Sequence, residues 1–364
     1  MCSAITRDPQ ISGLARKDWR SVRILIIGGT RFIGPPLVHL LHDQGHTIWL
    51  FHRHPAQVAL PEGVQHLFGE RARLPDHADD FRNILPDVVI DMIPLGEQDA
   101  HIVVTAFRGL AGRLISLSSQ DVYRAYGRVQ GTEPGHPDPL PLTEDSPLRQ
   151  RLYPYRAETP RASDDPRRAL DDYEKILVER VILGAPDLPG TVLRLPMIYG
   201  PGDYQHRLYE YLRRMDDDRP AILVSEQLAR WRWTRDYVGN TAAAIALAAT
   251  NSRAAGRIYN IGERTALTTA DWIRAIGQVA GWDGLVVAAP DYQLPLEMQS
   301  HAGLDQELYV DTTRIRSELG FIAHYTREEG LRHTVAWERA NTPPARDPRQ
   351  FDYAAEDAIL ARLL

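Results

Sequence analysis

Lysine and cysteine are nearly absent from this 364-residue chain, which has one cysteine, Cys2, and two lysines, Lys17 and Lys175, among 42 basic residues. A single cysteine cannot form an internal disulfide, so the composition excludes a disulfide-stabilised scaffold. Long apolar runs are also missing, since no stretch approaches the ~20 residues that a membrane-spanning helix needs. The first twenty residues mix charged and polar groups and offer no apolar core for export. These absences predict a cytoplasmic protein with no membrane partner.

An excess of positive charge is missing as well, because 48 acidic residues oppose the 42 basic ones and the net charge is -6. This balance disfavours a protein that grips nucleic-acid phosphates over a broad basic face. The composition, 43% hydrophobic and 25% charged, is that of an ordinary folded protein and excludes wholesale disorder. The rarity of lysine makes Lys175 informative, since an ammonium is a compact charge that a guanidinium cannot always replace.

Short apolar runs alternate with helical patterns over the first ~120 residues. The nearly unbroken apolar run at 22–27 is typical of a strand buried on both faces. Further strands are expected at 47–51, 64–68, 87–90 and 113–117, with a helix at 102–110. Strands that alternate with helices imply a parallel sheet with right-handed crossovers. The predicted fold class is therefore α/β, with a Rossmann-type doubly wound parallel sheet.

The chain divides into four expected segments. These are a flexible leader at 1–20, a nucleotide-binding Rossmann domain at 21–200, a smaller mixed substrate-binding domain at 201–340 and a tail at 341–364 with a short helix. Some strands and helices of the third segment are allowed to return to the Rossmann core. The first domain includes a long loop rich in proline and glycine at 123–166, and loops of this length are often functional. A helix is expected to follow from about Arg167 to Leu183, and another at 327–340.

A glycine turn joins the first expected strand to its helix, with the sequence Gly28-Gly29-Thr30-Arg31-Phe32-Ile33-Gly34. Gly28 permits a tight reversal, the helix start offers amides to a pyrophosphate, and Gly34 lets the helix and strand pack closely. We therefore expect the cofactor to contact Gly28, Thr30, Arg31, Phe32, Ile33 and Gly34. Arg31 stands where such turns more often have glycine. A turn of the same shape that holds no ligand is the alternative.

The end of the second expected strand bears on the choice between NAD and NADP. An acidic residue there would accept a hydrogen bond from the ribose 2′-hydroxyl, but this chain has Phe51-His52-Arg53. Arg53 and Arg31 together are suited to binding a 2′-phosphate through charge-assisted hydrogen bonds. NADP is the predicted cofactor and NAD the less favoured one, with a solvated Arg53 as the alternative.

Four motifs occur in an order that resembles a known family: the glycine turn, Ser118-Ser119-Gln120-Asp121-Val122-Tyr123, Arg194-Leu195-Pro196-Met197-Ile198-Tyr199-Gly200-Pro201 and Arg235-Asp236-Tyr237-Val238. Together they resemble an extended short-chain dehydrogenase/reductase of the NAD-dependent epimerase/dehydratase family. The arginine in the turn resembles an atypical branch that includes the chloroplast stem-loop-binding proteins. The resemblance covers about residues 22–340 and implies a sugar nucleotide as the ligand and a possible homodimer.

The resemblance also implies roles for individual residues. Ser119 falls where the family has a serine or threonine that polarises a substrate hydroxyl or carbonyl, and a hydroxyl that only caps the backbone is the alternative. Lys175 matches the family lysine, which holds the nicotinamide ribose and lowers the pKa of a tyrosine; a solvated helix lysine is the alternative. Arg235 matches an arginine that contacts the diphosphate. The preceding Trp231-Arg232-Trp233 is suited to stacking on the base or sugar of the ligand. The alternative is a strand whose tryptophans belong to the hydrophobic core.

The family's acid/base tyrosine, four residues before the lysine, is missing, because Asp171 occupies that position. On a helix that includes both residues, Tyr173 points ~200° away from Lys175. Tyr173 can share the site of Lys175 only if the helix begins late or is locally distorted, and on that condition it joins Ser119, Lys175 and Asp171 as a candidate catalytic residue. Three interpretations remain open. Asp171 forms an (i, i+4) ion pair with Lys175, Asp171 acts as a general base, or a loop tyrosine, Tyr153 or Tyr155, reaches the site.

These observations favour an NAD(P)-dependent epimerase, dehydratase or oxidoreductase acting on a sugar nucleotide or a related hydroxylated small molecule, with an altered active site. The alternative is a protein of the same fold that binds NADP without turnover or associates with RNA. The arginines available for RNA are Arg151, Arg156, Arg161, Arg167 and Arg168. No metal is predicted, since the cluster of His42, His46, His52 and His54 lacks a metal-ligand spacing.

Overall fold

A seven-stranded parallel sheet organises the computed structural model, which describes residues 21–56, 58–300, 303–343 and 351–363. Its strands are β1 (Arg23–Ile27), β2 (Thr47–His52), β3 (Gln65–Phe68), β4 (Val88–Asp91), β5 (Arg113–Ser119), β6 (Gly190–Leu195) and β10 (Ile258–Asn260). They lie in the order β10-β6-β5-β4-β1-β2-β3, and every neighbouring pair is parallel. The predicted Rossmann-type fold is confirmed. The expected leader at 1–20 lies outside the described residues.

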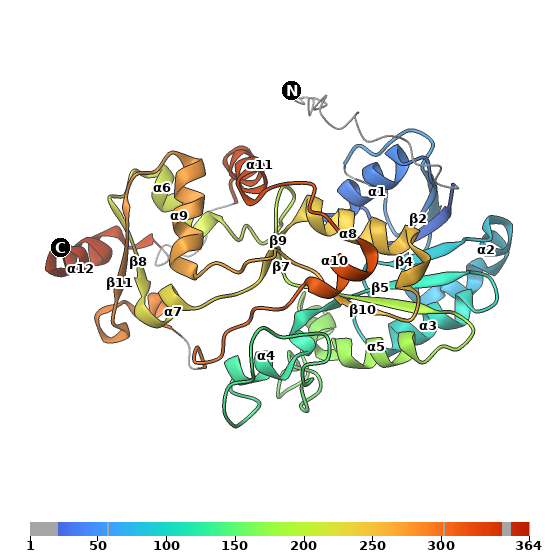
Figure 1. Ribbon diagram of the computed structural model, residues 1–364, viewed down its shortest axis with the longest axis horizontal. Coiled ribbons are helices and arrows are strands. Elements are labelled where there is room, and N and C mark those ends of the chain that lie inside the picture. Colours follow the sequence, from blue (N-terminus) through green and yellow to red (C-terminus); the bar gives the residue numbers. More distant parts are fainter. Residues whose placement is uncertain (1–20, 57, 301–302, 344–350, 364) are drawn as a thin grey trace.

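Helices cover both faces of this sheet (Figure 1). One face is covered by α1 (Gly34–Asp43) and α8 (Val238–Thr250), and the other by α2 (Ala78–Ile84), α3 (Glu97–Phe107) and α5 (Lys175–Leu183). Strands buried on both faces must be apolar throughout. This requirement explains the unbroken apolar run of β1, in which the four residues after Arg23 are buried.

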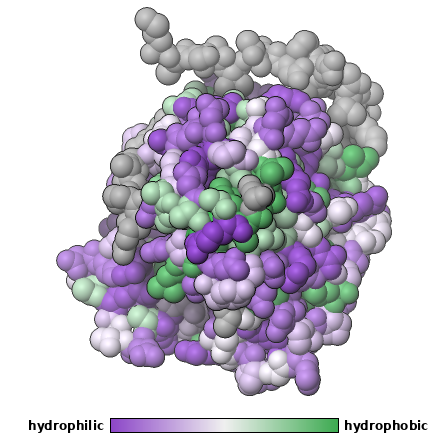
Figure 2. All heavy atoms as spheres, turned by 90° about the vertical axis from the view of Figure 1, so that its left-hand side faces the viewer, coloured by the Kyte–Doolittle hydropathy of each residue, from purple (hydrophilic) through white to green (hydrophobic). Residues whose placement is uncertain are grey.

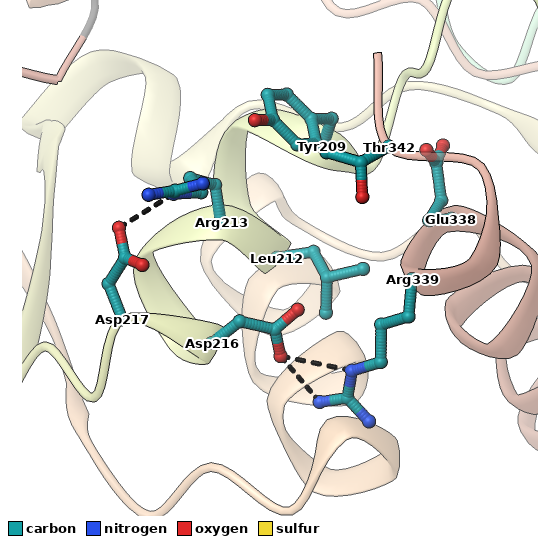
Figure 3. Close-up of a pocket in the computed structure, with 8 residues that line it drawn as sticks. All are labelled: Tyr209, Leu212, Arg213, Asp216, Asp217, Glu338, Arg339 and Thr342. Atoms are coloured by element: carbon teal, nitrogen blue, oxygen red, sulfur yellow. Dashed lines mark hydrogen bonds and ion pairs between the residues drawn. The ribbon is translucent and has the colours of Figure 1, made fainter. Parts of the chain in front are cut away.

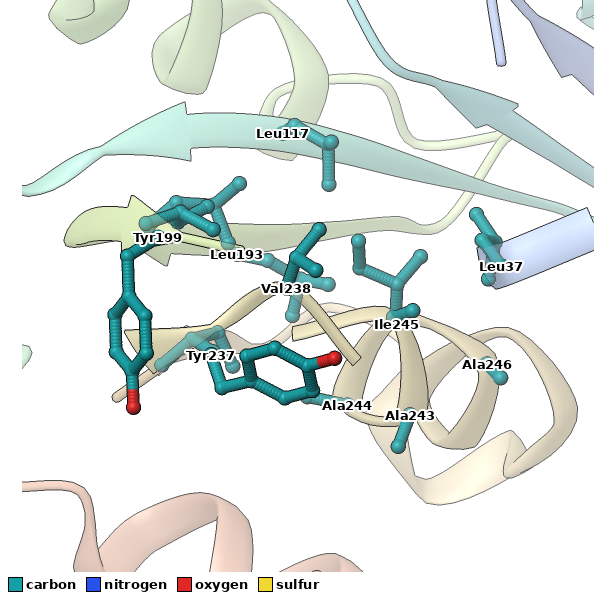
Figure 4. Packing of buried hydrophobic residues seen from close by; sticks show 14 of the residues in the cluster. Leu37, Leu117, Leu193, Tyr199, Tyr237, Val238, Ala243, Ala244, Ile245 and Ala246 are labelled. Carbon is teal, nitrogen blue, oxygen red and sulfur yellow. The ribbon is translucent and has the colours of Figure 1, made fainter. Parts of the chain in front are cut away.

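The packing of α8 against the sheet is shown in Figure 4. Val238 and Ile245 of α8 belong to one buried cluster with Leu117 of β5, Leu193 of β6 and Leu37 of α1. Burying each such side chain contributes about 1.5–3 kcal/mol. Because α8 follows residue 200 in the chain, the helix ties the second half of the protein to the Rossmann sheet.

A smaller mixed body lies at the other end of the molecule (Figure 1). It contains α6 (Tyr209–Asp216), β8 (Ala221–Ser225), α7 (Glu226–Arg230), α9 (Thr269–Ala280), β11 (Leu285–Ala289) and α12 (Tyr353–Leu363). β8 and β11 form a parallel pair, and Ile359 and Leu360 of α12 pack in the same cluster as Leu223 of β8. Figure 2 shows that this end is mainly hydrophilic, with a small apolar patch.

The remaining elements lie between these two bodies or beside them. They are α4 (Arg124–Val129), the parallel pair β7 (Met197–Tyr199) and β9 (Arg235–Tyr237), α10 (Thr313–Leu319) and α11 (Arg327–Ala340). The predicted helix at 327–340 is confirmed with the same bounds. No helix of the described ranges has the length and apolar character that crossing a membrane requires.

Two local predictions are wrong. The loop expected at 123–166 contains the helix α4 near its start. The helix expected from about Arg167 to Leu183 is two elements, a short 3₁₀ helix at Arg168–Asp172 and α5, which begins only at Lys175. This second break has consequences for the site.

Candidate active site

The glycine turn has the geometry of a close-packed βα turn. Gly28 and Gly29 have φ values of 93° and 83°, a region that side chains rarely adopt. A Cβ on Gly34 would lie 2.2 Å from the backbone carbon of Gly29, so only glycine allows α1 to approach the turn this closely. A Cβ on Gly28 would lie 3.3 Å from Cβ of Met92. The turn therefore brings backbone atoms to the carboxyl edge of the sheet, where a dinucleotide can approach.

The start of α1 offers fewer backbone N–H groups to a pyrophosphate than the sequence analysis expected. The helix α1 has proline at its first positions after Gly34, Pro35 and Pro36, and proline has no N–H. The start of the helix therefore offers fewer donors to a pyrophosphate than an ordinary helix start. The amides of Phe32, whose φ is 41°, and Ile33 are the donors that fit this role.

Two arginines flank this turn. Arg31 follows β1 and Arg53 follows β2, and the two strands are neighbours in the sheet, so both residues lie at its carboxyl edge. Both are exposed, and neither side chain has a hydrogen bond or an ion pair among the residues that the structure describes. Two unpaired guanidinium groups at one edge fit a phosphate ligand.

Three of the four predicted catalytic residues come together at the end of β5. The Ser119 side chain lies beside the Tyr173 hydroxyl and lowers its pKa, and the Nζ atom of Lys175 lies 5.5 Å from the centre of the Tyr173 ring. The ammonium of Lys175 donates to the carbonyl oxygens of Pro94 and Leu117, the latter at 3.0 Å. An ammonium has three donors, so one remains for a ligand.

Burial lowers the pKa of Lys175 to about 8, and the nearby charges of Asp91 and Asp121 offset part of this effect. Burial also raises the pKa of the Tyr173 hydroxyl well above its usual value, and the negative charge of Asp121 adds to the rise. Tyr173 is therefore a neutral proton donor in the protein without ligands, and Lys175 remains mainly a cation at neutral pH.

Tyr173 lies near Lys175 because the helix starts late, which is the condition on which Tyr173 is a candidate. Glu174 is the N-cap of α5, and its Oε1 atom accepts the backbone N–H of Ile176 at 2.8 Å. Tyr173 precedes the cap and has an extended backbone, so helical spacing does not apply to its side chain. The late start of α5 thus leaves the Tyr173 ring close to the ammonium of Lys175.

Asp171 lies away from Lys175 and does not form the expected (i, i+4) ion pair. Its carboxylate accepts the backbone N–H groups of Ala157 and Arg161 at 3.2 and 3.1 Å, and pairs with the guanidinium groups of Arg161 and Arg168. Burial alone would raise the pKa of Asp171, but these hydrogen bonds and the Arg161 charge keep it below its usual value. Asp171 therefore anchors the loop that contains Ala157 and Arg161, and it does not contact Lys175.

The loop does bring one tyrosine into the site, as one of the three interpretations expected. Oη of Tyr155 and Oη of Tyr173 both donate to Oδ2 of Asp121 at 2.9 Å. Tyr153 points elsewhere, since its ring lies 3.7 Å from the guanidinium carbon of Arg156. The sequence analysis missed Asp121 as a site residue, although it belongs to the same motif as Ser119 and could have been found by its position at the strand end.

Arg235 on β9 is buried, and its guanidinium carbon lies 4.7 Å from the centre of the Trp272 ring. One Nη atom donates to the carbonyl of Trp233 at 3.2 Å, while Nε is buried and has no hydrogen-bond partner among the described residues. Burial lowers the pKa of Arg235 to about 10. A buried guanidinium with an unused donor is suited to an anionic ligand.

Of the two tryptophans before Arg235, Trp231 is buried and Trp233 is partly buried against the same cluster. Trp231 is buried and donates from Nε1 to the carbonyl of Gln306 at 2.7 Å, and Trp233 donates to Oη of Tyr126 at 2.9 Å. Arg232 pairs with Glu307. These contacts match the core alternative, so stacking on a ligand finds no support here.

The arginines considered for RNA binding are mostly ion-paired. Arg161 pairs with Asp171, Arg167 with Asp165, and Arg156 and Arg168 with Asp172, the last two at 3.7 and 3.4 Å. Interleaved aspartates reduce the positive potential that a phosphate backbone would need. Within the described ranges, no three His, Cys, Asp or Glu side chains lie close enough together to hold a metal ion.

A hollow between α6 and α11 is a separate feature (Figure 3). Its volume is about 80 Å³, well below the ~300–1,000 Å³ of ligand pockets. Its arginines are already engaged, Arg213 with Asp217 and Arg339 with Asp216. This hollow is therefore too small and too internally paired to serve as a nucleotide site.

Residues 100–262 match the model of the NAD dependent epimerase/dehydratase family. This match covers less than half of the chain. The matched region includes the Ser119 motif, Lys175 and Arg235 and continues through β10, which joins the sheet beside β6. The region that matches the family model therefore spans both the hydroxyl cluster and the buried arginine.

Individual relatives agree with this domain. The chain is 31% identical over 174 residues to a dTDP-glucose 4,6-dehydratase of Streptomyces niveus, covering 46% of this chain and 48% of the relative. It is 23% identical over 316 residues to 2′-dehydrokanamycin reductase of Streptomyces kanamyceticus, covering 85% and 80%. The chain thus spans about half the length of the dehydratases that it matches.

Solved structures show the same fold. The Bordetella bronchiseptica enzyme WbmG in complex with NAD and UDP superposes with a TM-score of 0.62 at 17% identity, covering 88% of this chain and 95% of that one. At this identity the likeness establishes the architecture of the protein and not its ligand.

Proposed function

We propose that the protein is an NAD(P)-dependent oxidoreductase, epimerase or dehydratase acting on a hydroxyl-bearing carbon of a sugar nucleotide or a related hydroxylated small molecule. The supporting observation is the convergence of Ser119, Tyr173 and Lys175 at the same sheet edge as the Gly28 turn. The names of the compared dehydratases and the reductase support the same class of chemistry.

The nicotinamide cofactor, when bound, supplies or accepts a hydride. The chain's residues fit such a group, because the turn brings bare backbone to the sheet edge and Lys175 keeps one free donor for a ribose hydroxyl. Ser119 orients the reacting oxygen, and Tyr173 exchanges a proton with it. Arg235 holds the anionic part of the substrate. Whether the hydride returns to the same molecule decides between epimerisation, dehydration and net reduction.

NADP is the proposed cofactor. Arg31 and Arg53 are unpaired in the described part of the chain, and no acidic residue stands at the end of β2 to accept the 2′-hydroxyl of NAD. A cytoplasmic location and a homodimer belong to this proposal as well. The location rests on the single cysteine, and the homodimer rests on the family resemblance.

Calorimetric titration with NADP and with NAD tests the cofactor assignment. We expect tight NADP binding by the wild type and a loss of at least tenfold in affinity in the Arg31→Ala/Arg53→Ala variant, with little change for NAD. Arg332→Ala, an exposed arginine on α11, is the matched control. A folded protein that binds neither dinucleotide would contradict the proposed function.

Turnover is then measured with a panel of UDP- and dTDP-sugars by the absorbance of reduced nicotinamide. Tyr173→Phe should abolish turnover of any substrate found while dinucleotide binding remains, because the variant removes only the hydroxyl. Tyr209→Phe, on α6, is the control that should retain activity.

A further inference from the structure

The carboxylate of Asp121 has an unusual set of contacts. Its Oδ2 atom accepts hydrogen bonds from both Tyr155 and Tyr173 at 2.9 Å, whereas its Oδ1 atom is buried with no hydrogen-bond partner among the described residues. The two tyrosine rings pack at a centroid distance of 5.2 Å. A buried polar atom without a partner is costly, so it calls for an explanation.

Among the described residues, no cation forms an ion pair or a hydrogen bond with this carboxylate. Arg149 donates its Nε to the backbone carbonyl of Asp121 and pairs with Glu174 through its Nη atoms. Lys175 donates to two backbone carbonyls. Tyr126 is a further ionisable group beside Asp121, and its hydroxyl accepts a hydrogen bond from Trp233.

The protonation states follow from this environment. Burial raises the pKa of Asp121, while the two tyrosine hydroxyls and the charges of Arg149 and Lys175 offset part of the rise. The ammonium of Lys175 lies over the Tyr173 ring, and the Tyr173 hydroxyl faces an anion. A phenolate at Tyr173 is therefore disfavoured, and the proton has a nearby acceptor of raised basicity.

We propose that Asp121 is the proton acceptor of a relay in which Tyr173 takes the proton of the substrate hydroxyl as it passes its own proton to Oδ2 of Asp121. This inference rests on the proposed function. In the oxidation direction a bound nicotinamide dinucleotide would accept the hydride of the C–H bond. The O–H proton goes to Tyr173, the proton of Tyr173 goes to Asp121, and Asp121 ends protonated beside a carbonyl product. Reduction reverses each transfer, so atoms and charge balance.

Tyr155 is the positioning residue of this relay. It keeps its own proton and holds Oδ2 in place while Tyr173 exchanges protons. The loop that delivers it is fastened by Asp171, which accepts the N–H groups of Ala157 and Arg161, and by Glu174, which accepts the N–H of Tyr153. Because the Tyr155 hydroxyl stabilises the charged carboxylate, its removal should make Asp121 more basic.

Infrared difference spectroscopy tests the relay on the protein without cofactor. Spectra of the wild type recorded between pH 4 and pH 9 should contain a carboxylic-acid band that titrates above the ordinary aspartate range. We expect Asp121→Asn to lack this band and Tyr155→Phe to shift its midpoint to higher pH. Asp165→Asn, which alters an aspartate paired with exposed Arg167, is the control and should keep the band unchanged. A wild-type spectrum that Asp121→Asn leaves unaltered would overturn the relay.

Turnover provides the second measurement once a substrate is found. Asp121→Asn should lower kcat by at least a hundredfold with dinucleotide affinity retained, and Tyr155→Phe should move the acidic limb of the pH–kcat profile upward. Wild-type kcat and pH profile in Asp121→Asn, with Tyr173→Phe inactive, would overturn the relay and leave the proposed function standing. A wild type that binds no dinucleotide would instead contradict the proposed function, and the infrared titration would still decide whether Asp121 is a raised-pKa proton acceptor.

Discussion

Glu174 and Arg149 form an ion pair in the interior of the protein, with 3.2 Å between Oε1 and an Nη atom and side chains that are 0% and 1% exposed. Glu174 also caps α5 through Ile176 and accepts the backbone N–H of Tyr153. One carboxylate thus connects the start of the helix that holds Lys175 to the loop that holds Tyr155. The geometry of the hydroxyl cluster depends on this connection.

Removing the charge of Glu174 should therefore be strongly destabilising. In Glu174→Gln the guanidinium of Arg149 stays buried without a counter-charge, and breaking such a pair costs about 3–5 kcal/mol. Urea denaturation measures the change in free energy of unfolding. Glu318→Gln removes the partly exposed pair with Arg257 and should cost about 1 kcal/mol or less. Equal losses in the two variants would contradict the role of Glu174.

Gly34→Ala should disrupt the cofactor turn. The added Cβ would lie 2.2 Å from the backbone of Gly29, so α1 must move away from the turn. We expect a loss of stability of at least about 3 kcal/mol, the upper range for point substitutions, together with loss of dinucleotide binding in calorimetry. Gly45→Ala is the control, because its φ of 83° is strained but the space around it is open, and it should cost about 1–2 kcal/mol with binding unchanged.

The parallel sheet could be predicted because buried parallel strands have a local signature. The unbroken apolar run of β1, the glycine turn after it and the helix of 327–340 are all set by residues near each other in the sequence. The assignment of Ser119 and Lys175 to one site followed from the same pattern of motifs, and the structure places both at the end of β5.

The position of Tyr173 could not be predicted, because it depends on contacts from distant segments. A run of residues with helical propensity from 167 to 183 contains no local signal that α5 must start at Lys175. The break is stabilised by Arg149 and Tyr153, which bind Glu174, and by Arg161, which binds Asp171. Tertiary ion pairs and backbone hydrogen bonds override helix propensity here.

Lys175 should make the stability of the protein depend on alkaline pH. Its pKa of about 8 in the folded state lies below the ordinary value of 10.5, so between these values the unfolded state binds more protons. The contribution of Lys175 to the free energy of unfolding is therefore lowest below pH 8, and it rises as the pH increases towards 10.5. Thermal unfolding of wild type and Lys175→Met should therefore show the wild type gaining Tm relative to the variant over this window. A pH-independent difference would contradict the burial of a titrating lysine.

Asp171 should act on the loop and not on the chemistry. Asp171→Ala removes the acceptor of two backbone N–H groups and two guanidinium groups, which lowers the free energy of local opening. We expect trypsin to cleave after Arg156 or Arg161 at least about tenfold faster, equivalent to a loss of about 1.4 kcal/mol. Asp165→Ala, which frees only Arg167, is the control. Loss of turnover in Asp171→Ala without faster cleavage would contradict this role. It would show that Asp171 takes part in catalysis as a general base, because the loop would then be as closed as in the wild type.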